Sequence, residues 1–220
     1  MRISARLTLA ALAATLLLAV GLSTASARNL SVSNQSIRLT WRSLEFTGAE
    51  IVIRCPVTLE GTFHARTIAK VENTLIGYIT RAVAKQEACT NGIGAPFNGT
   101  ERYNGGTPAS SLPWHMTYKF FSGTLPNIVG IRILLLGFRF GIRDSAGLCT
   151  GQYGPRPEGI DAEASVGAGG VITELSPVPP NESTLIRRDG GIFCPATGRL
   201  TGRAEVMLLG TTTRITVTLI

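Results

Sequence analysis

The chain carries, at residues 51–64, the stretch IVIRCPVTLEGTFH. From Ile51 to Phe63 every second residue is apolar or small, and the residues between them are mostly polar. A period of two over this length indicates a β-strand with one face on a core and the other toward solvent. Pro56 has no amide hydrogen for a sheet ladder, so we expect it at a sheet edge or beside a bulge. The stretch therefore predicts a β-rich fold.

The segment before it follows the same pattern with one interruption. Ile37, Leu39 and Trp41 alternate with polar residues, and the phase then slips by one residue to Leu44 and Phe46. Without a compensating distortion, the slip would turn the second half of the strand away from the core. The sequence therefore predicts a β-bulge between Trp41 and Leu44.

Segments farther along the chain extend the pattern to its end. Alternation recurs over 114–120, where Trp114, Met116, Tyr118 and Phe120 share one face, and again over 212–220; residues 123–127 resemble a turn. Residues 69–83 have apolar residues at helical spacing, but Gly77 and several β-branched residues favour a strand. Loops are expected at 91–111, 150–159 and 176–183, which are rich in Gly, Pro, Ser and Asn. Together these segments predict an all-β fold, an antiparallel two-sheet β-sandwich with at most one short helix.

The first 27 residues have the three parts of a secretory signal peptide. Arg2 and Arg6 precede the apolar run 7–22, and Ala25 and Ala27 provide the small residues of a cleavage site. The run has about 16 residues, fewer than the ~20 that cross a bilayer. We therefore expect cleavage after Ala27, a secreted extracellular protein with no membrane span in the mature chain, and a single β-sandwich domain over 28–220.

Charge limits the classes of partner. The chain has a formal net charge of +7, which becomes +5 without Arg2 and Arg6. The cations are dispersed, and Arg187 and Arg188 are the only adjacent pair of the mature chain. Nucleic-acid binding usually needs a concentrated basic stripe, so we expect no nucleic-acid partner. A basic surface can still attract anionic polymers of a cell surface.

Four cysteines remain after cleavage, at positions 55, 89, 149 and 194. An even number in an exported chain predicts two disulfides, for which three pairings exist. We favour Cys55–Cys89 and Cys149–Cys194, because each bridge then closes a neighbouring segment. The sequence has no Cys-x-x-Cys pair, which disfavours a zinc ribbon or a thioredoxin-like redox site.

The sequence offers little for catalysis. Its only histidines are His64 and His115, and it contains no Gly-x-Ser-x-Gly nucleophile elbow. We therefore predict no catalytic residue, no metal-ligand set and no cofactor. The weak candidate for binding is Trp114 with His115, which could form a stacking platform for a sugar or an aromatic ligand. The alternative is that the Trp114 side chain fills one end of the hydrophobic core of the sandwich.

Five phrases carry a resemblance to a known group. They are Arg28-Asn29-Leu30-Ser31, Val57-Thr58-Leu59-Glu60-Gly61, Thr67-Ile68-Ala69-Lys70, Leu112-Pro113-Trp114-His115 and residues 121–127. With these phrases, most of the mature chain resembles exported bacterial β-rich proteins of unassigned activity, which implies an exported β protein and no particular activity. A fainter similarity to small exported activators of alkane oxidation rests on a strand cysteine, the Leu-Pro-Trp phrase and Gly-rich turns, and it transfers no function.

Three hypotheses about function follow. The first is a non-catalytic extracellular structural or interaction module, with a cell-surface polymer or a protein as its partner. The second is a secreted hydrolase whose histidine or carboxylate groups are dispersed in the sequence. The third is an outer-membrane β-barrel, which the arginine-bearing strand faces and the expected disulfides disfavour.

Overall fold

The computed structural model describes residues 29–96, 112–155, 159–178 and 184–220. These residues form antiparallel β-strands and two three-residue 3-10 helices, η1 (Gln86–Ala88) and η2 (Ala168–Gly170). Among them, no helix has the length and apolar character needed to cross a membrane. The predicted signal peptide lies outside the described residues.

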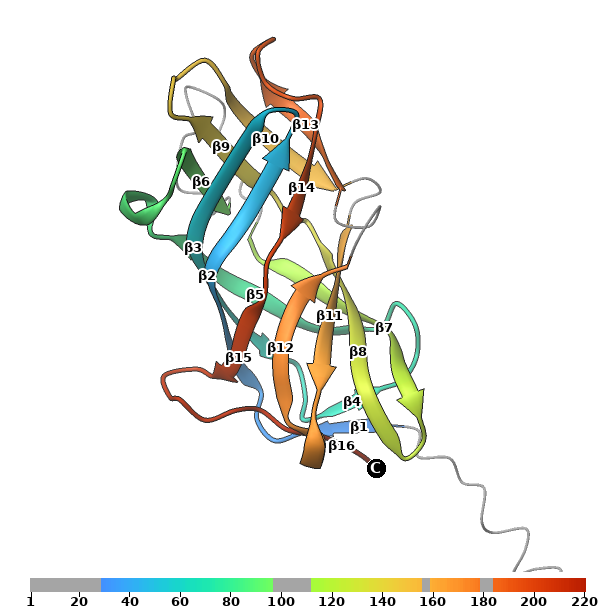
Figure 1. Cartoon of the computed structure of the whole chain (residues 1–220). Helices are drawn as coiled ribbons and strands as arrows, with labels where there is room; N and C mark the ends of the chain where they lie inside the picture. Colours follow the sequence, from blue (N-terminus) through green and yellow to red (C-terminus); the bar gives the residue numbers. More distant parts are fainter. Residues whose placement is uncertain (1–28, 97–111, 156–158, 179–183) are drawn as a thin grey trace, which may run out of the picture.

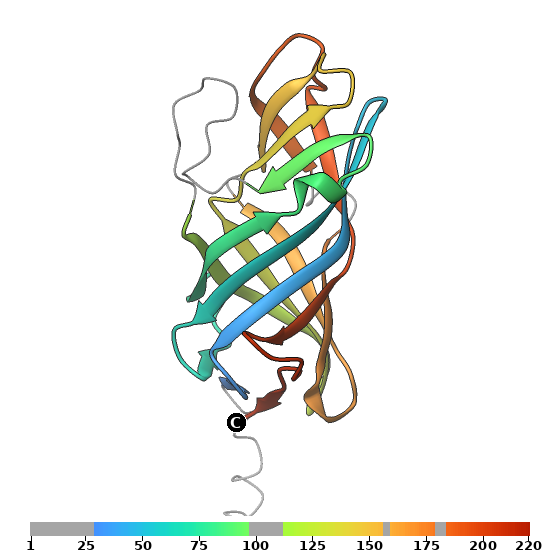
Figure 2. The same ribbon diagram turned by 90° about the vertical axis from the view of Figure 1, so that its left-hand side faces the viewer.

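Eight strands form a closed antiparallel barrel (Figure 1, Figure 2). They pair in the order in which they follow one another in the chain, and the last of them pairs with the first. The strands are β2 (Ser36–Gly48), β3 (Ile51–Phe63), β5 (Leu75–Ala84), β7 (Trp114–Thr124), β8 (Asn127–Leu136), β11 (Gly159–Val166), β12 (Ile172–Pro177) and β15 (Ala204–Leu208).

The all-β antiparallel class is thus confirmed, and the two-sheet sandwich is corrected. Glu205 of β15 lies opposite Thr40 of β2, so the sheet curls until its two edge strands pair. Closure removes the unpaired amide and carbonyl groups that two open sheets would leave at their edges. The strand preferred over a helix for residues 69–83 is present as β5 over 75–84.

A second group of strands extends from one end of the barrel. It continues from β2 through β14 (Thr197–Thr201), β13 (Thr184–Gly190), β10 (Thr150–Pro155) and β9 (Phe140–Asp144) to β6 (Gly92–Pro96). This is possible because β2 and β3 have 13 residues each, so that one half of β2 pairs with β15 and the other with β14. The loops predicted at 91–111, 150–159 and 176–183 are therefore wrong over 92–96, 150–155, 159 and 176–177, which lie in strands; residues 97–111, 156–158 and 179–183 lie outside the described residues.

The bulge predicted in β2 is confirmed. Trp41 pairs with Val57 and Leu44 pairs with Cys55, which leaves Arg42 and Ser43 as exposed residues between them. Pro56 lies opposite this irregularity, although its strand is not at an edge because β3 pairs with both β2 and β5. The bulge keeps Trp41 and Leu44 both buried while β2 passes from the barrel into the second group of strands.

A small sheet covers the other end of the barrel. It consists of β16 (Val217–Leu219), β1 (Asn29–Val32) and β4 (Thr67–Ala69), with β1 in the middle. Leu30, Ile68 and Val217 of this sheet are buried in the core. The final strand expected from the alternation over 212–220 is therefore present and paired.

Aromatic rings connect the barrel core to the core of the second group of strands. Ring centroids are 4.8 Å apart for Trp114 and Phe138, 6.4 Å for Phe138 and Phe140, 6.1 Å for Phe140 and Phe46, and 4.7 Å for Phe46 and Tyr153. The two groups of strands thus share one continuous core.

Phe120 does not follow the predicted alternation. A register shift between Tyr118 and Phe120 turns its ring outward, where Arg132 covers it with its guanidinium carbon 4.9 Å from the ring centroid. The ring is 45% exposed, so the prediction that Phe120 shares the core face was wrong.

Both predicted disulfides are confirmed. Cys55 is bonded to Cys89 and Cys149 to Cys194, and no cysteine of the chain is free. Cys55 lies in β3 and Cys89 follows η1, so the first bridge ties the barrel to the segment that leads into β6. Two disulfides indicate an oxidising, extracellular type of environment.

Candidate functional site

The structure separates the two residues of the predicted binding site. Trp114 is fully buried, with its ring against Phe138 in the core. His115, the next residue of β7, points to the opposite, exposed face. A buried indole cannot stack on a ligand at the surface, so no Trp114–His115 platform forms.

The two histidines of the chain instead flank a tyrosine on the outer face of the barrel. The Tyr78 ring makes edge contacts with His64 at 4.6 Å and with His115 at 4.9 Å between centroids. The phenol separates the two imidazole rings, so they do not converge on a common point. Within the described ranges, no group of three His, Cys, Asp or Glu side chains is placed to hold a metal ion.

A shallow groove on the outside of the barrel gathers more charged side chains. It crosses β15, β2, β3 and β5, where outward positions recur every second residue. Four cations, two carboxylates and three threonines line it, together with Val83 and Met207: Arg38, Arg42, Arg81, Lys85, Glu60, Glu205, Thr40, Thr58 and Thr212. We call this set the basic groove.

Strand register explains how these side chains meet. Glu60 of β3 lies opposite Arg38 on one side and Arg81 on the other. Arg81 Nη1 donates to Glu60 Oε1 at 3.0 Å, and Arg42 Nη2, on the β2 bulge, donates to Glu205 Oε1 at 3.1 Å. Each carboxylate thus has one guanidinium partner, which leaves the groove with a surplus of two positive charges.

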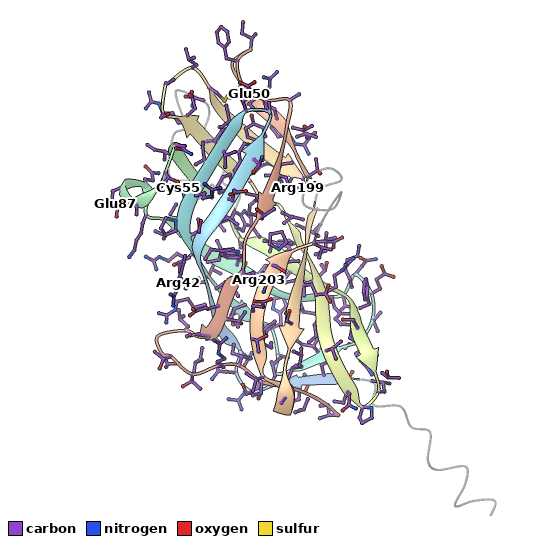
Figure 3. All side chains as sticks on the ribbon, in the orientation of Figure 1. Arg42, Glu50, Cys55, Glu87, Arg199 and Arg203 are labelled. Carbon is purple, nitrogen blue, oxygen red and sulfur yellow. A yellow bond between two sulfur atoms is a disulfide. The ribbon has the colours of Figure 1, made fainter. Side chains whose placement is uncertain are left out.

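More charged side chains lie on the same side of the molecule. Figure 3 shows Arg42, Arg199 and Arg203 on this side, and Arg203 and Arg54 form ion pairs with Glu174 and Glu45. The same view also labels two carboxylate residues, Glu50 and Glu87. The groove holds four cations against two carboxylates, and the remaining described residues hold twelve cations against nine carboxylates, so cations outnumber carboxylates most strongly in the groove.

Sequence reasoning missed this face because its members are distant in the chain. Arg42 and Glu205 are 163 residues apart and meet only where β15 closes the barrel on β2. The arginines that are dispersed in the sequence are therefore gathered by the topology. One signal for this face was present in the sequence. Arg38 on β2, and Arg54 and Glu60 on β3, occupy the polar, outward positions of the alternating pattern.

A second charged cluster lies on the outside of β7, β8 and β11. Asp161 is 6% exposed, and Lys119 Nζ lies 3.5 Å from its Oδ2. Glu163 accepts a hydrogen bond from Ser122 Oγ at 3.0 Å and lies 3.7 Å from Arg132 Nη2. Both carboxylates are thus held by neighbouring strands, an arrangement that ties β7 to β11 across β8.

The interior of the barrel is filled with apolar side chains. Two cavities, of about 40 and 50 Å³, remain on either side of a layer formed by Leu39, Met116, Ile133 and Leu175. A dry apolar cavity that admits a ring as small as benzene has roughly 150 Å³. The interior therefore offers much less room for a ligand than the basic groove does.

Comparisons of the chain with protein-family models, with curated proteins and with solved structures find no match.

Proposed function

We propose that the protein is a non-catalytic extracellular binding module that holds an anionic cell-surface polymer in the basic groove. The observation that carries this proposal is the excess of four cations over two carboxylates in the groove on the outer face of β15, β2, β3 and β5. The predicted signal peptide and the two disulfides support a location outside the cytoplasm, where such polymers occur.

The side chains of the groove suit this class of ligand. Guanidinium groups bind carboxylate, sulfate and phosphate oxygens through two parallel hydrogen bonds. Arg38 and Arg42 lie four residues apart on β2, or about 13 Å at ~3.3 Å per residue, so a chain of repeated anions can reach both. The hydroxyl groups of Thr40 and Thr58 between them can bond to polar groups of the same polymer.

An extended ligand fits this groove better than a single small anion. An exposed ion pair contributes only about 0.2–1 kcal/mol, and the groove is open to solvent that screens charge. Useful affinity therefore needs several contacts made at once, which a polymer with regularly spaced anions supplies.

The two other hypotheses have less support. A histidine-based hydrolase needs a base beside a nucleophile, whereas His64 and His115 both contact Tyr78, and Glu60 and Glu205 are each paired with an arginine. An outer-membrane barrel turns an apolar band outward, whereas these strands carry Arg38, Glu60 and Glu205 on their outer positions.

The test is a titration of the mature protein with dextran sulfate and polygalacturonate, at low and high salt, by isothermal calorimetry. Arg42→Ala/Lys85→Ala removes two exposed cations from the groove. We expect roughly a 5- to 30-fold loss of affinity, which corresponds to about 1–2 kcal/mol over two contacts.

The matched control is Arg66→Ala/Arg143→Ala, which removes the same charge from exposed positions outside the groove. We expect less than a twofold loss for this pair. Equal losses in both pairs, or no binding by the wild-type protein to either polymer, would contradict the proposed site. Release of new reducing ends from polygalacturonate would contradict the non-catalytic assignment.

A further inference from the structure

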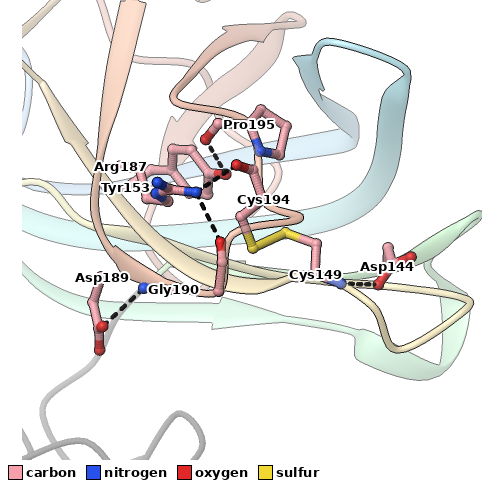
Figure 4. The surroundings of a disulfide bond; sticks show 9 residues. Asp144, Cys149, Tyr153, Arg187, Asp189, Gly190, Cys194 and Pro195 are labelled. Atoms are coloured by element: carbon pink, nitrogen blue, oxygen red, sulfur yellow. Dashed lines mark hydrogen bonds between the residues drawn. A yellow bond between two sulfur atoms is a disulfide. The ribbon is translucent and has the colours of Figure 1, made fainter.

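Three apolar side chains project from the end of the molecule that the second group of strands forms. Leu148 is 63% exposed, Ile192 87% and Phe193 68%. Leu148 directly precedes Cys149 and Phe193 directly precedes Cys194, and the Cα atoms of the two cysteines are 4.7 Å apart. The disulfide, drawn in Figure 4, therefore holds the two loops that carry these three side chains together, and we call the three residues the apolar tip.

Hydrogen bonds hold the two loops of the tip in place. Asp144 Oδ1 accepts from the Cys149 amide at 2.7 Å, and the Cys194 amide donates to the Gly191 carbonyl at 3.0 Å. Arg187 Nη1 donates to the carbonyl oxygens of Gly191 and Cys194 (Figure 4). The side chains at the tip are thus exposed on a braced structure rather than on a loose loop.

The same bonds satisfy part of the polar backbone of the loop from within. The carbonyl groups of Gly191, Cys194 and Pro195 all accept hydrogen bonds from the protein, the last from Tyr153 Oη at 2.8 Å. Each carbonyl group that is already bonded lowers the free-energy cost of moving the loop from water into an apolar phase.

The tip lies at one end of the molecule and has charged residues near its base. The loops at 145–148 and 190–196 lie at the end of the molecule opposite the C-terminus, beyond the ends of their strands (Figure 1). Arg143 of β9 and Arg188 of β13 are exposed near the bases of these loops, each followed by an aspartate, and Arg188 Nη2 donates to the Pro155 carbonyl at 2.7 Å. Arginines in such a place can reach phosphate groups while apolar residues ahead of them enter the hydrocarbon.

We propose that the apolar tip inserts into the interface of a phospholipid bilayer and anchors the protein reversibly. A convex, braced apolar projection needs no matching cavity in a fluid bilayer. The site is separate from the basic groove and does not depend on the function proposed for it.

A tryptophan placed at the tip tests this directly. The native Trp41 and Trp114 are 4% and 0% exposed, so in a Phe193→Trp variant the change in fluorescence comes from position 193. On addition of vesicles of phosphatidylcholine with phosphatidylglycerol we expect a blue shift, and quenching by brominated lipid. In Val71→Trp, which replaces a side chain 61% exposed outside the tip, we expect neither.

A second variant tests the loss of binding. Ile192→Ser/Phe193→Ser keeps both disulfides and should lower the partition into these vesicles at least tenfold, with polyanion binding in the groove unchanged. No blue shift at any lipid concentration, or equal quenching at positions 71 and 193, would overturn the proposal. A blue shift that follows protein concentration without lipid would overturn it as well, because the tip would then bind a second copy of the chain.

Discussion

Tyr153 shows how a single buried side chain braces the second group of strands. Its ring is fully buried against Phe46, and its hydroxyl donates to the Pro195 carbonyl at 2.8 Å. Burial raises the pKa of Tyr153 to about 12, and the Arg187 charge opposes this shift in part. The neutral phenol is therefore the form that the fold requires.

From this pKa we predict a loss of stability in alkaline solution. In the unfolded chain the phenol loses its proton near its ordinary pKa of 10.0, and in the folded protein only near pH 12. Its contribution is fully present below pH 10 and disappears as the pH rises to 12. Urea unfolding across this range should show the decline, and Tyr153→Phe should reduce it. An unfolding free energy that is constant from pH 10 to 12 would contradict the assignment.

Gly198 of β14 is a second position where one atom decides the packing. A Cβ atom built there would lie 2.2 Å from the Phe46 ring. We predict that Gly198→Ala lowers the free energy of unfolding by about 1–3 kcal/mol through overpacking. Gly191→Ala is the control, since its Cβ would meet no atom within 4 Å, and its effect should stay within about 0.5 kcal/mol. Equal effects in denaturant titrations would contradict the close approach.

At the scale of the strand, local pattern was a good guide where the ladder is regular. The alternation from Ile53 to Gly61 is visible in the burial of β3, and the phase slip between Trp41 and Leu44 is the bulge of β2. The bulge that exposes Phe120 left no such signal, because an aromatic residue fits the expected pattern whichever face it takes. The strands at 92–96 and 150–155 did not stand out because both are rich in Gly and Pro. The partner of β6 is the distant β9, and β10 pairs with the distant β13 as well as with its neighbour β9.

The disulfide at the tip should stabilise the strands that it joins. Cys149 and Cys194 are 45 residues apart, and a crosslink of this span removes about 4 kcal/mol of chain entropy from the unfolded state. We predict that Cys149→Ser/Cys194→Ser lowers the free energy of unfolding by about this amount and opens the segment 190–196 to proteolysis. Polyanion binding should be retained. A loss below about 1 kcal/mol would show that the unfolded chain gains little freedom from removing the bridge.

At the scale of the whole molecule, the aromatic chain should make the barrel and the second group of strands unfold together. Phe138 links Trp114 of the barrel to Phe140 of β9. We predict a single calorimetric transition for the wild-type protein. Phe138→Ala should destabilise the molecule by about 3–5 kcal/mol, with both groups of strands affected. Two resolved transitions in the wild-type protein would contradict a shared core.

The closure of the barrel and the basic groove were beyond the reach of the sequence for the same reason. The alternation of β2 and β15 shows that each has an inner face, and nothing in either strand shows that the two pair. The charged side chains of the groove come from β2, β3, β5 with the residue after it, and β15, and only the pairing of β2 with β15 sets Arg42 beside Glu205. The disulfides were predictable because each joins neighbouring segments, so that no knowledge of the closed topology was needed.

The central claim is that surplus positive charge on one face of the barrel binds an anionic polymer. The most direct measurement is a backbone amide NMR titration of the folded protein with polygalacturonate. We expect the amide chemical shifts of Arg38, Arg42, Arg81 and Lys85 to change, and these changes to become smaller as salt is added. The chemical shifts of Arg66 and Arg143 should stay unchanged. Shifts spread evenly over all exposed cations, or confined to residues outside β15, β2, β3 and β5, would contradict it.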